Sequence, residues 1–174
     1  MLFRLVNAGT GAVLPIRDVT PVGNALTWQW APPRPPPPGR AGGELWEPVD
    51  MGDGTQQLRD LAGGGRLLGE AGPRARAWWF VPDGPHTIEH ARTGLRLGGE
   101  GCRWEADYRV NGCFQLRDAE TGRALGRLWR LRYGGAGTFR IQNAATGRVL
   151  SVTPGGRVAE VGDGRTPDRL WRFL

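Results

Sequence analysis

The sequence predicts an all-β fold, and two observations carry this prediction. Residues 138–174 contain four short stretches in which apolar and polar residues alternate, separated by turns that contain glycine or proline. Alternation with a period of two is typical of half-buried antiparallel strands. The chain also holds 29 glycines and 14 prolines beside 8 tryptophans, which suits many short strands joined by tight turns around a core.

The length of the chain bounds its organisation. Its 174 residues are enough for one domain with a sizeable hydrophobic core, so we predict a single domain over residues 1–174. No window reaches the roughly 18 apolar residues that a membrane span needs, so we expect none. The first residues enter the strand pattern without the apolar run of a signal peptide, which predicts a cytoplasmic protein unless export uses another route.

One strand–turn–strand motif, which we call a phrase, recurs along the whole chain. Its turn contains Thr-Gly in four copies and a glycine triplet in the second, and glycine suits a backbone position that needs a positive φ. Each of the last four phrases follows a strand that carries a tryptophan, and a fifth such strand closes the chain. The sequence therefore predicts an assembly of similar units. The phrases are Phe3–Ile16, Gln57–Glu70, Thr87–Gly99, Phe114–Gly126 and Phe139–Val152, and the tryptophan strands are Leu45–Val49, Ala77–Val81, Arg103–Glu105, Leu128–Leu131 and Leu170–Phe173.

The first unit contains two further features. A strand is expected over Ala25–Trp30, and a segment rich in proline and glycine follows at residues 32–43. Consecutive prolines lack amide donors and cannot join a sheet, so we predict an exposed loop with polyproline-II conformation in its middle.

The last segment resembles one lobe of a ricin-B-type β-trefoil. The resemblance rests on Phe139, on Asn143 followed by Thr146-Gly147, and on the closing Leu170-Trp171. The first unit, Phe3–Val49, resembles a second lobe that is extended by the proline loop. The resemblance implies a β-trefoil, which has three lobes of four strands. Because the chain has five phrases, another small closed repeat, such as a five-unit propeller, is the alternative.

The same resemblance implies a sugar site in the first unit. In sugar-binding lobes of this family an aspartate after the second strand holds sugar hydroxyls, and an aromatic residue on the third strand stacks on the ring. Asp18 matches the first position, and Trp28 or Trp30 matches the second. We therefore expect a non-catalytic, lectin-like module that binds a glycan or glycoprotein. The alternative is that Asp18 is a turn residue and the tryptophans are core residues.

The closing tryptophan motif departs from the family. The family ends each lobe in Gln-x-Trp, and this chain has another residue in place of the glutamine each time. This departure leaves open a scaffolding trefoil that binds no ligand. The three lobe ends are Glu44-Leu45-Trp46, Arg127-Leu128-Trp129 and Arg169-Leu170-Trp171.

The proline loop supports a different function. The chain also resembles mushroom-type β-trefoil inhibitors of serine and cysteine proteases, which act through exposed, stiff loops that lose little entropy on docking. Arg34 or Arg40 would then enter the specificity pocket of a protease. Pro35 obstructs a substrate-like geometry after Arg34, which favours Arg40. A polyproline ligand and an insertion without function are the other interpretations of this loop.

The charge distribution suggests a third function. The chain has no lysine, and residues 111–174 hold 11 arginines against 5 acidic residues, whereas residues 1–110 hold 12 of each. A polyanion could bind this basic third through Arg127, Arg130 and Arg132. The arginines are spaced rather than clustered, as on the solvent-facing side of strands, so we do not expect nucleic acid as a partner.

The sequence contains no motif that indicates an enzyme. The two histidines, His86 and His90, lie four residues apart on an expected strand, which separates them by roughly 13 Å and prevents them from sharing a metal ion. The glycine triplet Gly63-Gly64-Gly65 lacks the lysine and helix of a phosphate-binding loop. We therefore expect no catalysis, no cofactor and no metal.

Overall fold

The computed structural model describes residues 2–31, 44–69, 72–164 and 166–174. Apart from the one-turn 3-10 helix η1 (Pro167–Arg169), all regular elements in these ranges are β-strands, so the all-β prediction is confirmed. Among these residues no helix is long and apolar enough to cross a membrane. The loop at 32–43, with Arg34 and Arg40, lies outside the described residues, and its function stays a prediction.

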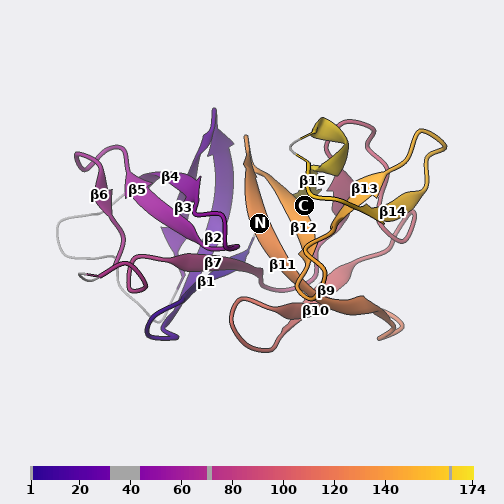
Figure 1. Ribbon diagram of the computed structural model, residues 1–174, viewed down its shortest axis with the longest axis horizontal. Coiled ribbons are helices and arrows are strands. Elements are labelled where there is room, and N and C mark those ends of the chain that lie inside the picture. The colour runs from indigo at the N-terminus through magenta and orange to yellow at the C-terminus, as the bar shows by residue number, and fades with distance from the viewer. Residues whose placement is uncertain (1, 32–43, 70–71, 165) are drawn as a thin grey trace.

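The N-terminal half forms one antiparallel sheet that closes on itself. Pairing runs from β1 to β7, β5, β4, β3 and β2, and β2 pairs with β1 again (Figure 1). We call this sheet the N-terminal ring. Its strands are β1 (Phe3–Asn7), β2 (Val13–Val22), β3 (Ala25–Trp30), β4 (Glu44–Asp50), β5 (Gln56–Asp60), β6 (Arg66–Leu67) and β7 (Trp78–Pro82).

The C-terminal half forms a second closed sheet, which we call the C-terminal ring. Pairing runs from β8 to β15, β12, β11, β10 and β9, and a bridge between His86 and Trp104 closes the circuit. Its strands are β8 (Ile88–His90), β9 (Trp104–Tyr108), β10 (Phe114–Asp118), β11 (Ala124–Gly135), β12 (Thr138–Asn143), β13 (Val149–Val152), β14 (Val158–Val161) and β15 (Trp171–Phe173).

The five repeated phrases become five hairpins, numbered 1 to 5 along the chain. The last residue of each first strand lies directly opposite a tryptophan of another strand. The amide of the next residue donates to the carbonyl of the residue before that tryptophan, at N···O distances of 2.7 to 2.9 Å. The opposed pairs are Asn7 with Trp78, Asp60 with Trp46, His90 with Trp171, Asp118 with Trp104, and Asn143 with Trp129.

The turns of these hairpins share one chemistry, which hairpin 5 illustrates. The Oδ1 atom of Asn143 accepts hydrogen bonds from the amides of Ala145 and Thr146, at 2.9 and 3.3 Å. The amide of Gly147 donates to the Asn143 carbonyl, and a φ of +72° makes glycine the residue that fits there. In hairpin 3 the Nδ1 atom of His90 takes the place of Oδ1 and accepts from the Thr93 amide at 3.2 Å.

Four of the closing tryptophans also form a side-chain hydrogen bond to the second strand of the hairpin that precedes them in the chain, which we call their own hairpin. Each indole Nε1–H donates to the carbonyl of a leucine that lies three residues after the turn glycine. The donor and acceptor pairs are Trp78 to Leu68 (3.0 Å), Trp104 to Leu97 (2.9 Å), Trp129 to Leu125 (2.8 Å) and Trp171 to Leu150 (3.0 Å). One tryptophan thus joins two hairpins, its own through the indole and a neighbour through the backbone.

These links explain why the sheets close as they do. Trp104 joins hairpin 3 to hairpin 4, Trp129 joins hairpin 4 to hairpin 5, and Trp171 joins hairpin 5 back to hairpin 3. The C-terminal ring is therefore a cycle of three units. In the N-terminal ring Trp78 joins hairpin 2 back to hairpin 1, and Trp46 pairs with hairpin 2.

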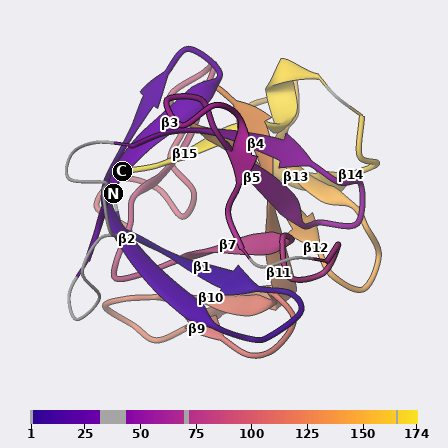
Figure 2. The same ribbon diagram turned by 90° about the vertical axis from the view of Figure 1, so that its left-hand side faces the viewer.

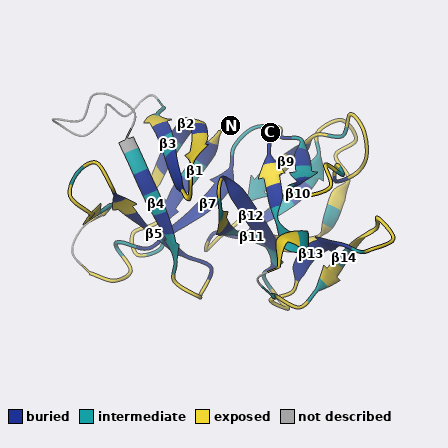
Figure 3. Ribbon diagram, turned by 90° about the horizontal axis from the view of Figure 1, so that it is seen from above, coloured by how far each residue is buried: buried dark blue, intermediate teal, exposed yellow. Residues whose placement is uncertain are grey.

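One hydrophobic core spans both rings. Phe3 and Phe80 of the N-terminal ring contact Phe139 of the C-terminal ring, with ring centroids 5.3 and 5.5 Å apart, and Phe173 packs against Phe3. The two ends of the chain consequently lie close together at the junction (Figures 1 and 2). The buried stretches of the strands meet there, while the exposed residues lie mostly in the outer loops (Figure 3).

A group of four charged side chains also joins the rings. Arg132 of β11 lies 2.6 Å from Asp50 of β4 and is also paired with Asp163. Arg140 of β12 contacts the same two carboxylates at 3.5 and 3.4 Å. Between 8% and 19% of each side chain is exposed, so water screens these pairs little.

We predict that Asn143→Ala destabilises the protein by about 1–3 kcal/mol, because the two hydrogen bonds from the Ala145 and Thr146 amides to the buried Asn143 side chain are lost. Chemical denaturation measures this change. The control is Thr146→Ala in the same turn, which removes only an exposed hydrogen bond to the Arg148 amide and should cost clearly less. Equal effects of the two substitutions would contradict the proposed role of the asparagine.

The pairing of Asp118 with Cys102 predicts a pH dependence. The Cys102 thiol donates to Asp118 Oδ2 at 3.0 Å, and this bond, with the amide of Thr121, lowers the pKa of the Asp118 carboxyl to about 2. Because the pKa is lower in the folded state, the contribution of Asp118 to stability is complete above its ordinary pKa of 3.8 and declines toward pH 2. Unfolding free energies of the wild type and Asp118→Asn should therefore converge as the pH falls from about 5 to about 2. A constant difference would contradict this pairing.

Candidate functional site

The structure places Asp18 on the surface of the N-terminal ring. The residue lies in an irregularity of the β2–β3 pairing and has a φ of +52°. Its side chain is 67% exposed, and its ion-pair partner is the adjacent Arg17, with Nε and Oδ2 3.9 Å apart. Asp18 is thus a solvent-exposed bulge residue.

The two candidate tryptophans of the first unit lie in or against the core. Trp28 is 2% exposed and stacks on Trp46, with ring centroids 5.5 Å apart and an interplanar angle of 5°. Trp30 is half-buried and packs edge-on against both of these rings. Trp28 therefore belongs to the core, as in the alternative interpretation, and its ring offers no exposed face to a sugar.

The three arginines considered for polyanion binding lie in different surroundings. Arg132 is 11% exposed and is paired with Asp50 and Asp163. The guanidinium of Arg130 lies 5.9 Å from the ring centroid of Trp79, and its Nε donates to the Asn111 carbonyl. Arg127 is exposed. Arg132 thus forms ion pairs at the junction between the rings.

Both histidines are buried and have structural contacts. His86 packs against Phe3 and Phe173, and burial lowers its pKa below the ordinary value of 6.5. His90 lies in the turn of hairpin 3, edge-on to Trp171. In the part of the chain that the structure describes, no group of three or more His, Cys, Asp or Glu side chains is placed to hold a metal ion.

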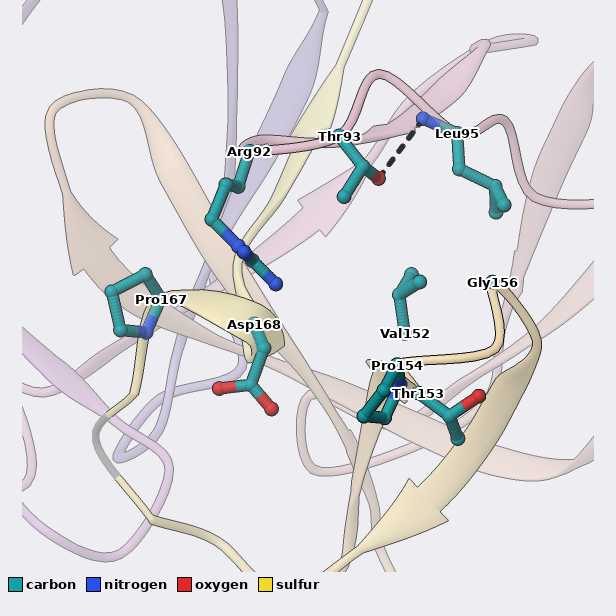
Figure 4. Close-up of a pocket in the computed structure, with 9 residues that line it drawn as sticks. All are labelled: Arg92, Thr93, Leu95, Val152, Thr153, Pro154, Gly156, Pro167 and Asp168. Carbon is teal, nitrogen blue, oxygen red and sulfur yellow. Dashed lines mark hydrogen bonds between the residues drawn. The ribbon is translucent and has the colours of Figure 1, made fainter.

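A pocket of about 680 Å³ opens on the C-terminal ring. Three segments that are distant in sequence form it: the turn of hairpin 3, the turn between β13 and β14, and η1 (Figure 4). Pockets that bind small molecules have about 300–1,000 Å³, so this one has a suitable size. Its lining residues are Arg92, Thr93, Leu95, Val152, Thr153, Pro154, Gly156, Pro167 and Asp168.

The carboxylate of Asp168 is held in place by hydrogen bonds. The buried Ser151 hydroxyl lies 3.0 Å from Asp168 Oδ2 and 2.9 Å from the Asp168 carbonyl. Hydrogen bonding from Thr166 and then from Ser151 lowers the pKa of the Asp168 carboxyl below its ordinary value of 3.8, although burial opposes this shift. The pocket therefore contains a carboxylate that is ionised at neutral pH.

The other walls of the pocket supply a cation, hydroxyl groups and apolar surface. Arg92 extends from the turn of hairpin 3 toward the side of the pocket that holds Asp168, yet the ion-pair partner of the carboxylate is Arg169, at 4.0 Å (Figure 4). The Thr153 hydroxyl accepts from the Arg157 amide and keeps its own hydrogen for another acceptor. Leu95, Val152 and the two proline rings form the apolar surface.

The position of Thr93 follows from the turn chemistry of hairpin 3. Its hydroxyl lies 2.8 Å from His90 Nδ1 and accepts a hydrogen bond from the Leu95 amide at 3.3 Å. Because His90 is itself packed against Trp171, the closing strand fixes this wall of the pocket relative to η1.

The comparisons with known proteins give limited information. No family model and no curated protein matches this chain. Among solved structures, a designed 3-fold symmetric protein, ThreeFoil, is similar with 14% identity and a TM-score of 0.28, over 99% of this chain and 97% of that one. A salivary protein from Culex quiquefasciatus of the Cysteine and Tryptophan-Rich (CWRC) family has 11% identity and a TM-score of 0.27, over 99% and 92%. With TM-scores this low, neither similarity establishes the fold of this chain.

Sequence reasoning missed Asp168 as a site residue. In the last unit the position after the second strand, where the family has its aspartate, falls at Ser151–Pro154, and this stretch contains no carboxylate. The structure brings Asp168 to this position from η1, beyond the third strand of the unit. The Thr166-Pro167-Asp168 sequence has the proline and the acidic residue that are typical of a helix start, so it could have indicated the helical turn η1. It could not have indicated that Asp168 contacts Ser151.

We predict that the Asp168 carboxyl titrates below pH 3.8 and that Thr166→Ala and Ser151→Ala each raise its pKa, because each removes a hydrogen bond to the ionised form. A carbon-detected NMR titration of the side-chain carboxyl measures this value. Thr153→Ala is the control and should leave the pKa unchanged. A wild-type pKa at or above 3.8 would contradict the described geometry.

Proposed function

We propose that this protein is a non-catalytic, lectin-like module that binds a glycan or glycoprotein through the Asp168 pocket. The single observation that supports the proposal is that an ionised carboxylate, an arginine and apolar side chains line one pocket of about 680 Å³.

The chemistry of the pocket suits a sugar. A carboxylate accepts hydrogen bonds from two neighbouring hydroxyls, whereas a guanidinium donates to hydroxyl and ring oxygens. The proline and leucine side chains provide apolar surface for the C–H face of a pyranose ring, a role that the sequence-based hypothesis gave to Trp28 or Trp30. A ligand that both donates and accepts on one side and is apolar on the other matches this lining.

The cycle of three units supports a finer description of the fold. We propose that residues 86–173 form a closed three-unit repeat related to the ricin-B-type β-trefoil, in which hairpins 3, 4 and 5 are the three lobes. The support is the closure of hairpin 5 onto hairpin 3 through Trp171. The pocket begins at Val152, the end of the second strand of the last lobe, which is where the resemblance expects a sugar-binding residue.

A glycan-array screen of the purified protein tests the proposed function. We expect wild-type binding that Asp168→Ala weakens by about tenfold or more, because charge-assisted hydrogen bonds contribute about 1.5–3 kcal/mol each. Arg92→Gln should also weaken binding, and Asp18→Ala should leave it unchanged. An array without any bound glycan, or binding that Asp18→Ala abolishes and Asp168→Ala retains, would overturn the proposal.

A further inference from the structure

A second cleft, of about 390 Å³, lies at the junction of the two rings and is separate from the Asp168 pocket. The N-terminal ring contributes Asp53, Thr55, Arg74 and Trp79, and the C-terminal ring contributes Asn111 and Arg130. The cleft therefore exists only when both rings are packed together.

The position of Trp79 in this cleft is tightly constrained. A Cβ atom on Gly112 would lie 2.2 Å from the Trp79 Cγ atom, so glycine lets the turn between β9 and β10 lie directly on the indole ring. Gly112 also has a φ of +73°, which glycine adopts readily. The Arg130 guanidinium lies 5.9 Å from the ring centroid. Trp79 is thus held between the rings and is 7% exposed.

Trp79, Arg130 and Arg74 place hydrogen-bond donors in the lining of this cleft. The Nε1–H of Trp79 is buried and has no partner among the described residues, although buried donors in folded proteins are nearly always paired. Arg130 uses its Nε for the Asn111 carbonyl at 3.0 Å, which leaves its two terminal nitrogens as donors. Arg74 uses one terminal nitrogen for the Ala8 carbonyl at 3.3 Å and keeps its other donors.

The acidic side chain of the cleft does not balance these donors. The Oδ1 atom of Asp53 accepts from both the amide and the hydroxyl of Thr55. Two arginines and one aspartate also leave the lining with a net positive charge. The positive charge and the guanidinium donors of this lining suit an anion that is rich in acceptors.

We propose that this cleft is a ligand site for a small molecule that carries an oxyanion, namely a carboxylate, phosphate or sulfate group. The oxyanion accepts from the Arg130 and Arg74 guanidinium groups beside the Trp79 ring, and guanidinium groups are well suited to planar or tetrahedral oxyanions. The neutral part of the molecule lies beside Met51, Pro73 and Ala77. This proposal does not depend on sugar binding at Asp168.

NMR titration of the full chain tests this site, with the indole Nε1–H signal of Trp79 assigned by comparison with Trp79→Phe. The probes are glucose, glucuronate, glucose 6-phosphate and glucose 6-sulfate, which share one skeleton and differ in the anionic group. Inorganic phosphate and sulfate are titrated beside them. We expect a saturable shift of the Trp79 signal with at least one anionic probe and none with glucose, and the tightest probe identifies the anion.

Matched variants make the test specific. Arg130→Gln should weaken binding of that probe by about tenfold or more, since it removes the two terminal donors. Arg127→Gln removes the same charge from an exposed position outside the cleft and should keep the affinity, as should Asp168→Ala in the other pocket. The proposal is overturned if no anionic probe gives a saturable shift. Equal weakening by Arg127→Gln and Arg130→Gln would also overturn it, because binding would then depend only on net charge.

Discussion

The structure depends on a double contact made by the closing tryptophans. An indole Nε1–H donates to a leucine carbonyl of its own hairpin, and the backbone around the same tryptophan pairs with the first strand of another hairpin. Two-stranded hairpins are marginally stable alone, so each unit gains its stability from this link and from burial of the large ring. The order of the links decides which hairpins form a closed ring.

Both candidate sites follow from how the rings close and pack. The Asp168 pocket forms because Trp171 returns hairpin 5 to hairpin 3 and so brings Arg92 beside η1. The cleft at Trp79 forms because the rings share a core of phenylalanines and a nearly buried group of four charges around Asp50. The cost of removing these charges from water offsets most of their mutual attraction, so the group adds little net stability. Separating the rings would leave buried charges without partners, and the group therefore fixes how the rings are positioned.

The sequence was sufficient to predict the units but not their closure. Local alternation, Thr-Gly turns and tryptophan strands identified the all-β fold and the five hairpins, because these signals are short-range. The pairing of β1 with β7, and of β8 with β15, depends on contacts between residues far apart in the chain. In hairpin 4, the second strand and the strand that carries Trp129 form one continuous strand, β11, so among the described residues no separate third strand lies between them. For β3, the alternation already placed Trp28 on the same side as buried Leu26, which explains why Trp28 lies in the core.

The most direct test of this account is a measurement of backbone NOEs across the strands that close the two rings. The account predicts contacts between Arg4 and Val81 and between Glu89 and Arg172, the residues paired in β1–β7 and β8–β15. A single ring of three lobes over the whole chain would instead pair the first strand with the last. Backbone contacts between β1 and β15, in place of these two pairs, would therefore contradict the account of two rings closed by tryptophans.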